Sequence, residues 1–140
     1  MDIDNSNKKI GTACDNGLIT MIDSNSEKCV IDYTIHDYSV WCCLIDPQSP
    51  NIVYSGADDA KLCAFDTLAN ETIFDKKVGQ YDSGICHIIN NPIDANQIIV
   101  GSFDEYIRIY DKRHMDKSVF TKKLDGGVWR MAGKSQQKQA

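Results

Sequence analysis

The sequence lacks a long apolar run, a concentration of positive charge and a secretory signal, and each absence argues against a class of protein. No apolar stretch approaches the roughly 20 residues that span a bilayer, and the first residues are polar and acidic. Acidic and basic side chains are interspersed and the net charge is −5, so no basic patch favours nucleic acid. We therefore expect a cytoplasmic protein that contacts neither membrane nor nucleic acid.

The cysteines match neither a zinc site nor a disulfide framework. The chain has no Cys-x-x-Cys pair and no His at zinc-finger spacing, and without a secretory signal disulfides are not expected. Several cysteines lie in apolar strand-like runs, where a reduced thiol acts as a small hydrophobic group. We expect free, buried thiols and neither metal nor cofactor. The six cysteines are Cys14, Cys29, Cys42, Cys43, Cys63 and Cys86.

Helical periodicity is also missing, whereas strand patterns are frequent. No long segment carries apolar residues at the i, i+3, i+4, i+7 spacing of a helix. In residues 106–111, tyrosines and an arginine alternate with isoleucines, the two-residue period of a pleated strand. Residues 40–45 are apolar throughout, which predicts a strand buried on both faces. The fold class predicted is all-β.

A strand–turn–strand pattern occurs three times. It is clearest at residues 100–111, recurs at 54–66 and is weaker at 11–23. The copies end at Asp23, Asp66 and Asp111, which are 43 and 45 residues apart. That spacing is the period of four-stranded propeller blades.

Inner strands are predicted to begin near residues 39, 84 and 127, at the same period. A closed propeller needs at least four blades. The sequence therefore predicts a partial, unclosed β-propeller of about three four-stranded antiparallel blades over residues 1–131. Within it, residues 1–9 are expected to fray, and the third of these inner strands is expected to start at 126–131. Residues 132–140 are expected to be a disordered polar tail.

The repeats resemble WD repeats. Ile22-Asp23, Phe65-Asp66 and Tyr110-Asp111 stand where that family has Trp-Asp. The turn Asp seven residues earlier is matched by Asp59 and Asp104, and the family's His is matched by His36. Ser102 fits its hydrogen-bonding Ser, whereas Ala57 does not.

Within that family, several motifs occur in the order found in the WD-repeat proteins of diphthamide biosynthesis, the diphthine methylesterases (also named diphthine methyltransferases). The motifs lie at residues 36–42, 53–59, 84–86, 101–113 and 126–130. The resemblance implies a cytosolic carboxylic-ester hydrolase. Its substrate would be the methyl ester of a modified histidine, diphthine, on translation elongation factor 2, and hydrolysis would free the carboxylate for a final amidation.

The chain departs from that family after Arg130. There the family continues into an inner strand that ends in Trp-His-Pro, whereas this chain has a polar tail. We expect a truncated or alternatively spliced form, or an imperfect gene model. Three blades leave open sheet edges with unpaired backbone groups, so we also expect poor stability or self-association.

Ester hydrolysis needs a base and donors for the developing oxyanion. His36, with Asp37 beside it and Ser39 close by, has the composition of a base with an orienting carboxylate. The alternative is that His36 is the structural WD-repeat histidine, bound to a turn Asp. His87 is expected in the core or facing the channel, and His114 in a solvated loop.

Four acidic residues are weaker candidates. Asp59 and Asp104 are explained as turn anchors that accept backbone N–H bonds, together with Ser102. The repeat explains Asp58 and Glu105 less well, so both stay as catalytic candidates with His36 and Asp37. The sequence does not identify the catalytic residues.

Three side chains are candidates for substrate binding. Trp41, Trp129 and Arg130 stand where inner strands begin, near one mouth of the channel. Arg130 could pair with a carboxylate or phosphate, whereas both tryptophans could instead pack between blades. No Gly-x-Ser-x-Gly, His-Glu-x-x-His or phosphate-loop motif is present. Two functions remain open, the ester hydrolase and a non-catalytic WD-repeat scaffold for protein partners.

Overall fold

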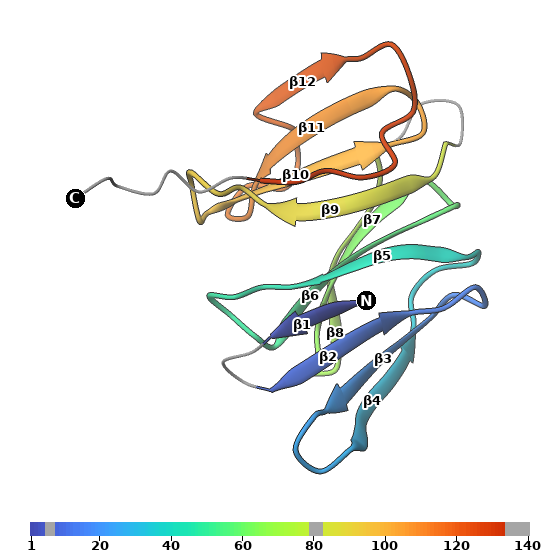
Figure 1. Cartoon of the computed structure of the whole chain (residues 1–140), viewed down its shortest axis with the longest axis vertical. Helices are drawn as coiled ribbons and strands as arrows, with labels where there is room; N and C mark the ends of the chain where they lie inside the picture. The colour runs from blue at the N-terminus through green and yellow to red at the C-terminus, as the bar shows by residue number, and fades with distance from the viewer. Residues whose placement is uncertain (5–7, 79–82, 134–140) are drawn as a thin grey trace.

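The computed structural model describes residues 1–4, 8–78 and 83–133, which form three four-stranded antiparallel sheets (Figure 1). The first sheet holds β1 (Asp2–Asp4), β2 (Lys9–Ala13), β3 (Leu18–Asp23) and β4 (Lys28–Thr34). The second holds β5 (Val40–Ile45), β6 (Ile52–Ala57), β7 (Lys61–Asp66) and β8 (Glu71–Lys77). The third holds β9 (Ile85–Asn90), β10 (Gln97–Ser102), β11 (Tyr106–Asp111) and β12 (Phe120–Lys123).

The sheets fan out from their first strands. β5 contacts β1 and β2 of the first sheet on one side and β9 of the third sheet on the other. Figure 1 shows β1, β5 and β9 close together, whereas β4 and β12 lie far apart at the periphery. The prediction of an all-β, unclosed arrangement of three four-stranded sheets is confirmed.

The same tight turn joins the second and third strand of each sheet. In each turn, one Asn or Asp side chain accepts a hydrogen bond from the backbone N–H two residues later. The distances are 3.1 Å for Asn16, 3.0 Å for Asp59 and 3.1 Å for Asp104. The residue between adopts a positive φ, 82° at Gly17, 60° at Ala60 and 72° at Glu105. Each third strand then ends at the Asp that marks the repeat. Those carboxylates accept backbone N–H bonds of the next turn.

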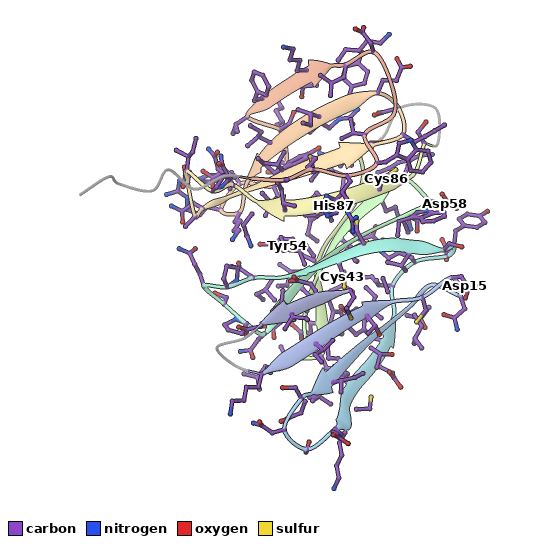
Figure 2. The ribbon with its side chains drawn as sticks, in the orientation of Figure 1. Asp15, Cys43, Tyr54, Asp58, Cys86 and His87 are labelled. Atoms are coloured by element: carbon purple, nitrogen blue, oxygen red, sulfur yellow. The ribbon has the colours of Figure 1, made fainter. Side chains whose placement is uncertain are left out.

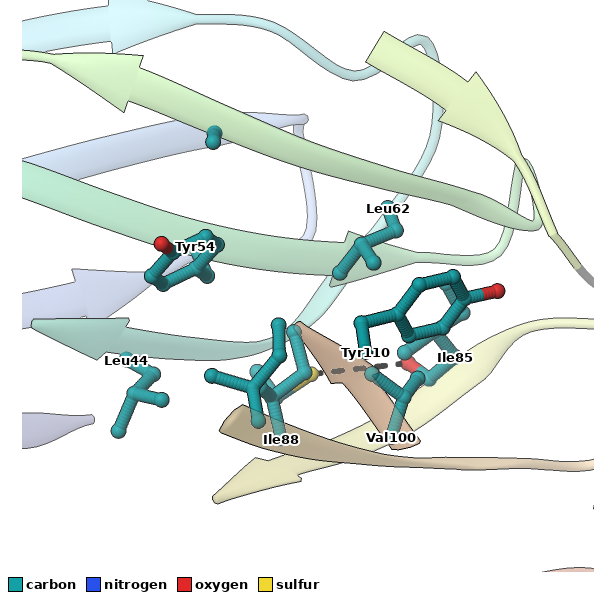
Figure 3. Close-up of a cluster of buried hydrophobic side chains, with 10 residues drawn as sticks. Leu44, Tyr54, Leu62, Ile85, Ile88, Val100 and Tyr110 are labelled. Carbon is teal, nitrogen blue, oxygen red and sulfur yellow. Dashed lines mark hydrogen bonds between the residues drawn. The ribbon is translucent and has the colours of Figure 1, made fainter. Parts of the chain in front are cut away.

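β5 is the centre of the core because both of its faces are covered. Cys42 and Leu44 belong to a cluster shared with the third sheet, and Cys43 and Ile45 to a cluster shared with the first. Figure 3 shows the former cluster, in which the Cys42 thiol lies 3.8 Å from the backbone oxygen of Ile85. The predicted two-faced burial of residues 40–45 is confirmed, except at Trp41, which is exposed.

The N-terminal residues differ from expectation. Instead of fraying, Asp2–Asp4 forms β1, which pairs with β2 as the innermost strand of the first sheet. The Asp2 carboxylate also accepts a 2.7 Å hydrogen bond from the backbone N–H of Ile45. Backbone pairing therefore orders a segment whose polar composition gave no strand signal. Residues 5–7 of the expected frayed segment lie outside the described residues.

The expected strand at residues 126–131 is not formed, because no described strand pairs with this segment. Its first apolar residue is nevertheless placed as in the preceding sheets. Val128 is buried and its N–H donates to the Ser102 carbonyl at 3.0 Å, as Val40 N–H does to Cys14. Of the expected tail, residues 134–140 lie outside the described residues.

All six cysteines are free, as expected, but not all are buried. Cys42, Cys43 and Cys63 are buried, whereas Cys29 is exposed on β4 and Cys14 and Cys86 are half-buried. Cys14, Cys29 and Cys86 therefore depart from the prediction, because the sequence does not reveal which positions at a strand end, on an outer strand or at a bulge are covered. The part of the chain that the structure describes contains no helix that could cross a membrane.

Candidate functional site

His36 lies in a buried hydrogen-bonded row of side chains. Its Nδ1 is 2.9 Å from an Asp59 carboxylate oxygen and its Nε2 is 2.8 Å from the Ser55 hydroxyl. In the neutral ring, Nδ1–H donates to the carboxylate and Nε2 accepts from the hydroxyl. The order Asp–His–Ser matches that of a hydrolase triad. However, His36 is 2% exposed and Ser55 1%, so no substrate reaches either group.

Of the two alternatives for His36, the structure shows the second, a structural histidine bound to a turn Asp, here Asp59. Asp37 points to solvent, with 78% of its side chain exposed, and its carboxylate lies 3.7 Å from Lys61 Nζ. Ser39 donates instead to the backbone oxygen of Asp15. The physical reason is that the β6–β7 hairpin brings the Asp59 carboxylate onto the ring. His36 and Asp37 do not form a base with an orienting carboxylate.

In the third sheet, which lacks an equivalent histidine, an arginine fills the same role. Arg108 Nη1 and Nη2 lie 3.1 and 2.6 Å from the two Asp104 oxygens, and both side chains are almost fully buried. The Ser102 hydroxyl donates to the Gly84 carbonyl at 3.1 Å. Asp104 is thus held in a structural ion pair that connects a tight turn to β11.

Glu105 lies in a turn and pairs with a lysine of the neighbouring strand. It is the positive-φ residue of its turn, and its carboxylate lies 3.7 Å from Lys123 Nζ on β12. His114 likewise lies in the loop after β11, where it forms an isolated bridge with Asp111. Neither residue lines the grooves described next, so the catalytic candidacy of Glu105 has no geometric support.

A β-bulge at the start of β5 and another at the start of β9 each turn one side chain out of the core. In β5 the pairing with β6 passes from Val40 to Cys42, and in β9 the pairing with β10 passes from Ile85 to His87. Trp41 and Cys86 are the residues left over, and a bulge of this kind redirects the side chain that it leaves unpaired. Trp129 follows Val128 at the corresponding position.

These three side chains line two adjoining grooves at one end of the inner strands. The first, which we call the aromatic groove, has a volume of about 400 Å³. It is lined by Trp41, Asp58, Ser83, Gly84, Cys86, Phe103 and Trp129. The second, the channel groove, has a volume of about 550 Å³ and runs along β5 and β9. It shares Trp41, Cys86 and Trp129 with the first and adds, among others, Asp2, His87 and Arg130.

Figure 2 shows Cys86 and Asp58 at the same end of the inner strands, with His87 further along β9. Trp41 Nε1–H donates to Asp58 Oδ1 at 2.7 Å, which fixes the indole beside the carboxylate. On the opposite wall, the rings of Phe103 and Trp129 meet edge to face, with centroids 5.2 Å apart. The aromatic groove therefore has three rings and one carboxylate in its wall.

Two glycines allow these walls to come together. A Cβ at Gly84 would lie 2.7 Å from Asp58 Oδ1, and one at Gly127 would lie 2.9 Å from the Phe103 ring. Any larger residue at either position would displace the carboxylate or the ring. The local sequence, a glycine before each Ile85-Cys86 or Val128-Trp129 pair, thus shapes the groove.

His87 lines the channel groove as a neutral hydrogen-bonding group. Its Nδ1 accepts a 2.9 Å hydrogen bond from the backbone N–H of Met131, which leaves the ring proton on Nε2. Burial, and then the nearby Arg130 guanidinium, lower the pKa of His87 below its usual value. Of the two sequence alternatives, core or channel-facing, the structure shows the second. The described residues hold no group of three His, Cys, Asp or Glu side chains that could bind a metal ion.

The two adjoining grooves bring together five of the residues singled out from sequence, and the others lie elsewhere. The five are Trp41, Asp58, His87, Trp129 and Arg130. Sequence reasoning missed Cys86 and Phe103 as groove residues. Cys86 could have been found, because it stands at the same position after the start of its predicted inner strand as Trp41 and Trp129 do in theirs. For Phe103 there was no signal, because an aromatic residue in a turn is not distinguishable from an ordinary exposed one.

No family model matches the chain. It is 29% identical over 131 residues to a diphthine methyltransferase of Schizosaccharomyces pombe, covering 94% of this chain and 40% of that protein. It is 32% identical over 103 residues to the Homo sapiens diphthine methyltransferase, covering 73% of this chain and 22% of that protein. The chain thus spans less than half the length of these relatives.

The fold is also similar to that of solved structures. One chain of a crystal structure of the mitotic checkpoint complex superposes with a TM-score of 0.80, at 21% identity, over 91% of this chain and 38% of that chain. This likeness supports a propeller-like fold. Together with the sequence relatives, it shows a fragment made of WD repeats. Within that class, it resembles the diphthine methyltransferases.

Proposed function

We propose that this run of repeats supplies part of the substrate site of a carboxylic-ester hydrolase in diphthamide biosynthesis. The reaction would remove the methyl ester from diphthine on translation elongation factor 2 in the cytoplasm. The observation that carries the proposal is the similarity to proteins named diphthine methyltransferase over as much as 94% of the chain. The channel groove is the concave surface in the described residues whose polar groups suit this chemistry.

Hydrolysis of the ester requires a donor where negative charge develops. A water oxygen bonds to the carbonyl carbon, the bond to the methoxy oxygen breaks, and methanol leaves with a proton from the water. The carbonyl oxygen carries the charge in between, and a neutral N–H donor stabilises it. His87 fits this role, because its Nδ1 is occupied by Met131 N–H and its proton is on Nε2.

Arg130 suits the negative charge that develops on the ester oxygens in the transition state and remains on the carboxylate product. Its exposed guanidinium lines the same groove as His87, and guanidinium groups pair with carboxylates through two parallel hydrogen bonds. Loss of a charge-assisted hydrogen bond costs about 1.5–3 kcal/mol. We therefore expect Arg130→Gln to lower turnover by roughly one to two orders of magnitude.

The direct test is methanol release from elongation factor 2 that carries the diphthine methyl ester. We expect release by the wild-type chain, a large decrease for Arg130→Gln, and no change for the matched control Arg113→Gln. Arg113 is an exposed arginine that pairs with Asp111 and lines neither groove. Equal activity of both variants, or methyl uptake from S-adenosylmethionine in place of methanol release, would contradict the proposal.

A non-catalytic scaffold is the second candidate, and one observation favours it. The Asp–His–Ser arrangement of Asp59, His36 and Ser55 is buried and structural. The exposed aromatic groove would then serve a protein partner without chemistry. Saturable binding of elongation factor 2 with no methanol release, under conditions where the Schizosaccharomyces pombe relative turns over the same substrate, would favour the scaffold.

A further inference from the structure

One face of the third sheet carries a row of apolar side chains that no described sheet covers. The strands pair so that Ile99 lies beside Ile89 and Ile109, and Ile109 lies beside Phe120. Residues that pair directly across neighbouring strands project from the same face. None of the four belongs to the cluster that the third sheet shares with the second, and Phe120 is 49% exposed. An apolar sheet face of this kind requires another layer to bury it.

The second sheet shows what covers such a row. By the repeat period, its matching residues are Leu44, Tyr54, Ala64 and Phe74, which pair in the same order across β5 to β8. All four take part in the cluster of Figure 3, where the third sheet packs on them. The surface that fits the row of the third sheet is therefore a face of the kind that a sheet turns toward the sheet before it.

The first sheet presents a face of that kind, also without a described cover. Ile10 pairs with Ile3 and Ile22, so these three side chains share the face directed away from the second sheet. The matching side chains of the second sheet are buried in its contact with the first, and they are Ile45, Val53 and Phe65. Figure 1 shows the first and third sheets on opposite sides of the second, so their free faces can meet only between two copies.

Charge favours contact between unlike faces over contact between two identical ones. Lys122 pairs with Ile107 and therefore lies on the apolar face of the third sheet. Asp32 pairs with Thr20 and therefore lies on the free face of the first sheet. Both charged side chains are exposed. A first sheet on a third sheet brings opposite charges together, whereas two third sheets would bring lysines together.

The inner strands at the two faces are complementary as well. β5 pairs with β6 from Val40 to Ile45, whereas β1 pairs with β2 only at Asp2–Asp4. By the repeat period, β1 matches the second half of β5, so the first half has no counterpart in the first sheet. Residues 128–131 match that first half, and no described strand pairs with them.

The segment at 128–131 of one copy and β1 of another would therefore complete one inner strand. Val128 is already held at the start of that position by the Ser102 carbonyl. Ala132 and Gly133 would leave the position that the other copy's β1 takes, and neither belongs to a strand.

We propose that two copies of this chain assemble head to tail, with the first sheet of each covering the third sheet of the other. The two contacts are identical, so the pair closes into a ring of six sheets, three from each copy. Closed propellers of four to eight blades are common, so six sheets suit a ring. The assembly is independent of the proposed hydrolysis, because Ile10 and Ile99, at the centres of the two faces, line neither groove.

The test is sedimentation equilibrium of the full chain over a wide range of protein concentration. We expect a reversible equilibrium between one copy and two, with no larger species. Ile99→Asp and Ile10→Asp each place a carboxylate at the centre of one face, and each should weaken association at least about 30-fold. The matched control is Leu68→Asp, because Leu68 is 79% exposed in the turn after β7 of the second sheet. It should change the association constant by less than about threefold.

A mixture of the two variants separates loss of docking from loss of folding. Ile10→Asp keeps an intact third-sheet face and Ile99→Asp keeps an intact first-sheet face, so the mixture should form a mixed pair although neither variant associates alone. Four results would overturn the proposal: a wild type that stays a single copy at every concentration, growth beyond two copies, equal weakening by Leu68→Asp, or a mixture that does not associate. Methanol release is not part of this readout, so failure here and failure of the proposed function are distinguishable.

Discussion

Replacement of His36 by alanine should destabilise the fold strongly, because the ring connects two buried polar groups. His36→Ala removes the partner of the Asp59 carboxylate, whose side chain is only 4% exposed, and of the Ser55 hydroxyl. A lost hydrogen bond to a charged group costs about 1.5–3 kcal/mol and a neutral one about 1 kcal/mol. The Asp59 carboxylate would also stay buried without the ring, and a buried polar group that loses its partner keeps its full desolvation penalty, which is larger for a charged group. We therefore expect the free energy of unfolding to fall by about 4 kcal/mol.

The assay is urea denaturation followed by tryptophan fluorescence, with thermal unfolding as a second measure. For a chain of this length, about 4 kcal/mol corresponds to a decrease in Tm of roughly 10–15 °C. The matched control is Asp37→Asn, because Asp37 is adjacent in sequence but exposed. We expect it to change the free energy of unfolding by less than about 0.5 kcal/mol.

A small effect of His36→Ala, within about 1 kcal/mol of the wild type, would refute this reasoning, since about 1 kcal/mol is the value of one ordinary hydrogen bond. A second result would also refute it. If a His36 variant remained as stable as the wild type but released no methanol, His36 would be a catalytic group after all. The burial of Ser55 and His36 predicts the reverse, a loss of stability that precedes any loss of activity.

Three further predictions concern contacts between the second and third sheets and the channel groove. Lys112→Met should lower the free energy of unfolding by about 3 kcal/mol in urea denaturation, because it leaves the buried Asp46 carboxylate without the ammonium now 3.0 Å away. Little change would contradict this. A double variant that also replaces Asp46 by Leu should recover much of the loss. Gly56→Ala should cost about 1–3 kcal/mol by the same measurement, since its Cβ would lie 2.3 Å from a side-chain carbon of the third sheet, whereas the control Gly126→Ala, with no atom within 4 Å, should be neutral. The lowered pKa of His87 means that the unfolded chain binds the proton more tightly than the folded chain does. The free energy of unfolding should therefore be highest above about pH 6.5 and decrease as the pH falls below it. The decrease should be smaller in His87→Gln, and an equal pH dependence in both proteins would contradict the assignment.

The repeat and its turns could be predicted from the sequence because they depend on local chemistry. Asp59 and Asp104 accept bonds from residues two positions later, and Asp23, Asp66 and Asp111 end strands at the predicted positions. Such contacts involve neighbours in the chain, so composition and spacing contain them. The buried run at residues 40–45 was predictable for the same reason, since continuous apolar character indicates two covered faces.

The site was harder to predict because it depends on contacts between distant segments. Asp59 reaches His36 from 23 residues away, and Asp58 reaches Trp41 from 17 residues away. The sequence offered two partners for His36, the adjacent Asp37 and a turn Asp, and the structure shows the second. Bulges at Trp41 and Cys86 depend on the register between strands, which no single strand sequence specifies.

The predictions for residues 2–4 and for residues 126–131 were wrong for a related reason, since strand formation there depends on whether a partner strand is present. Asp2–Asp4 pairs with β2 despite its polar sequence. Residues 126–131 carry an apolar start but no described strand pairs with them, and Val128 alone is fixed by the Ser102 carbonyl. Strand propensity is therefore a weaker guide than the availability of a partner edge.

The central claim is that the surface at Trp41 and Trp129, and not the buried His36 row, meets the substrate. The most direct measurement is the ¹⁵N–¹H spectrum of the two indole groups during titration with elongation factor 2 that carries the diphthine methyl ester. We predict that both indole signals shift or broaden when less than one equivalent of elongation factor 2 has been added. We predict that His36→Ala instead changes the midpoint of unfolding, because His36 belongs to the buried row. Indole signals that stay unchanged while other resonances of the chain respond to the substrate would contradict the account.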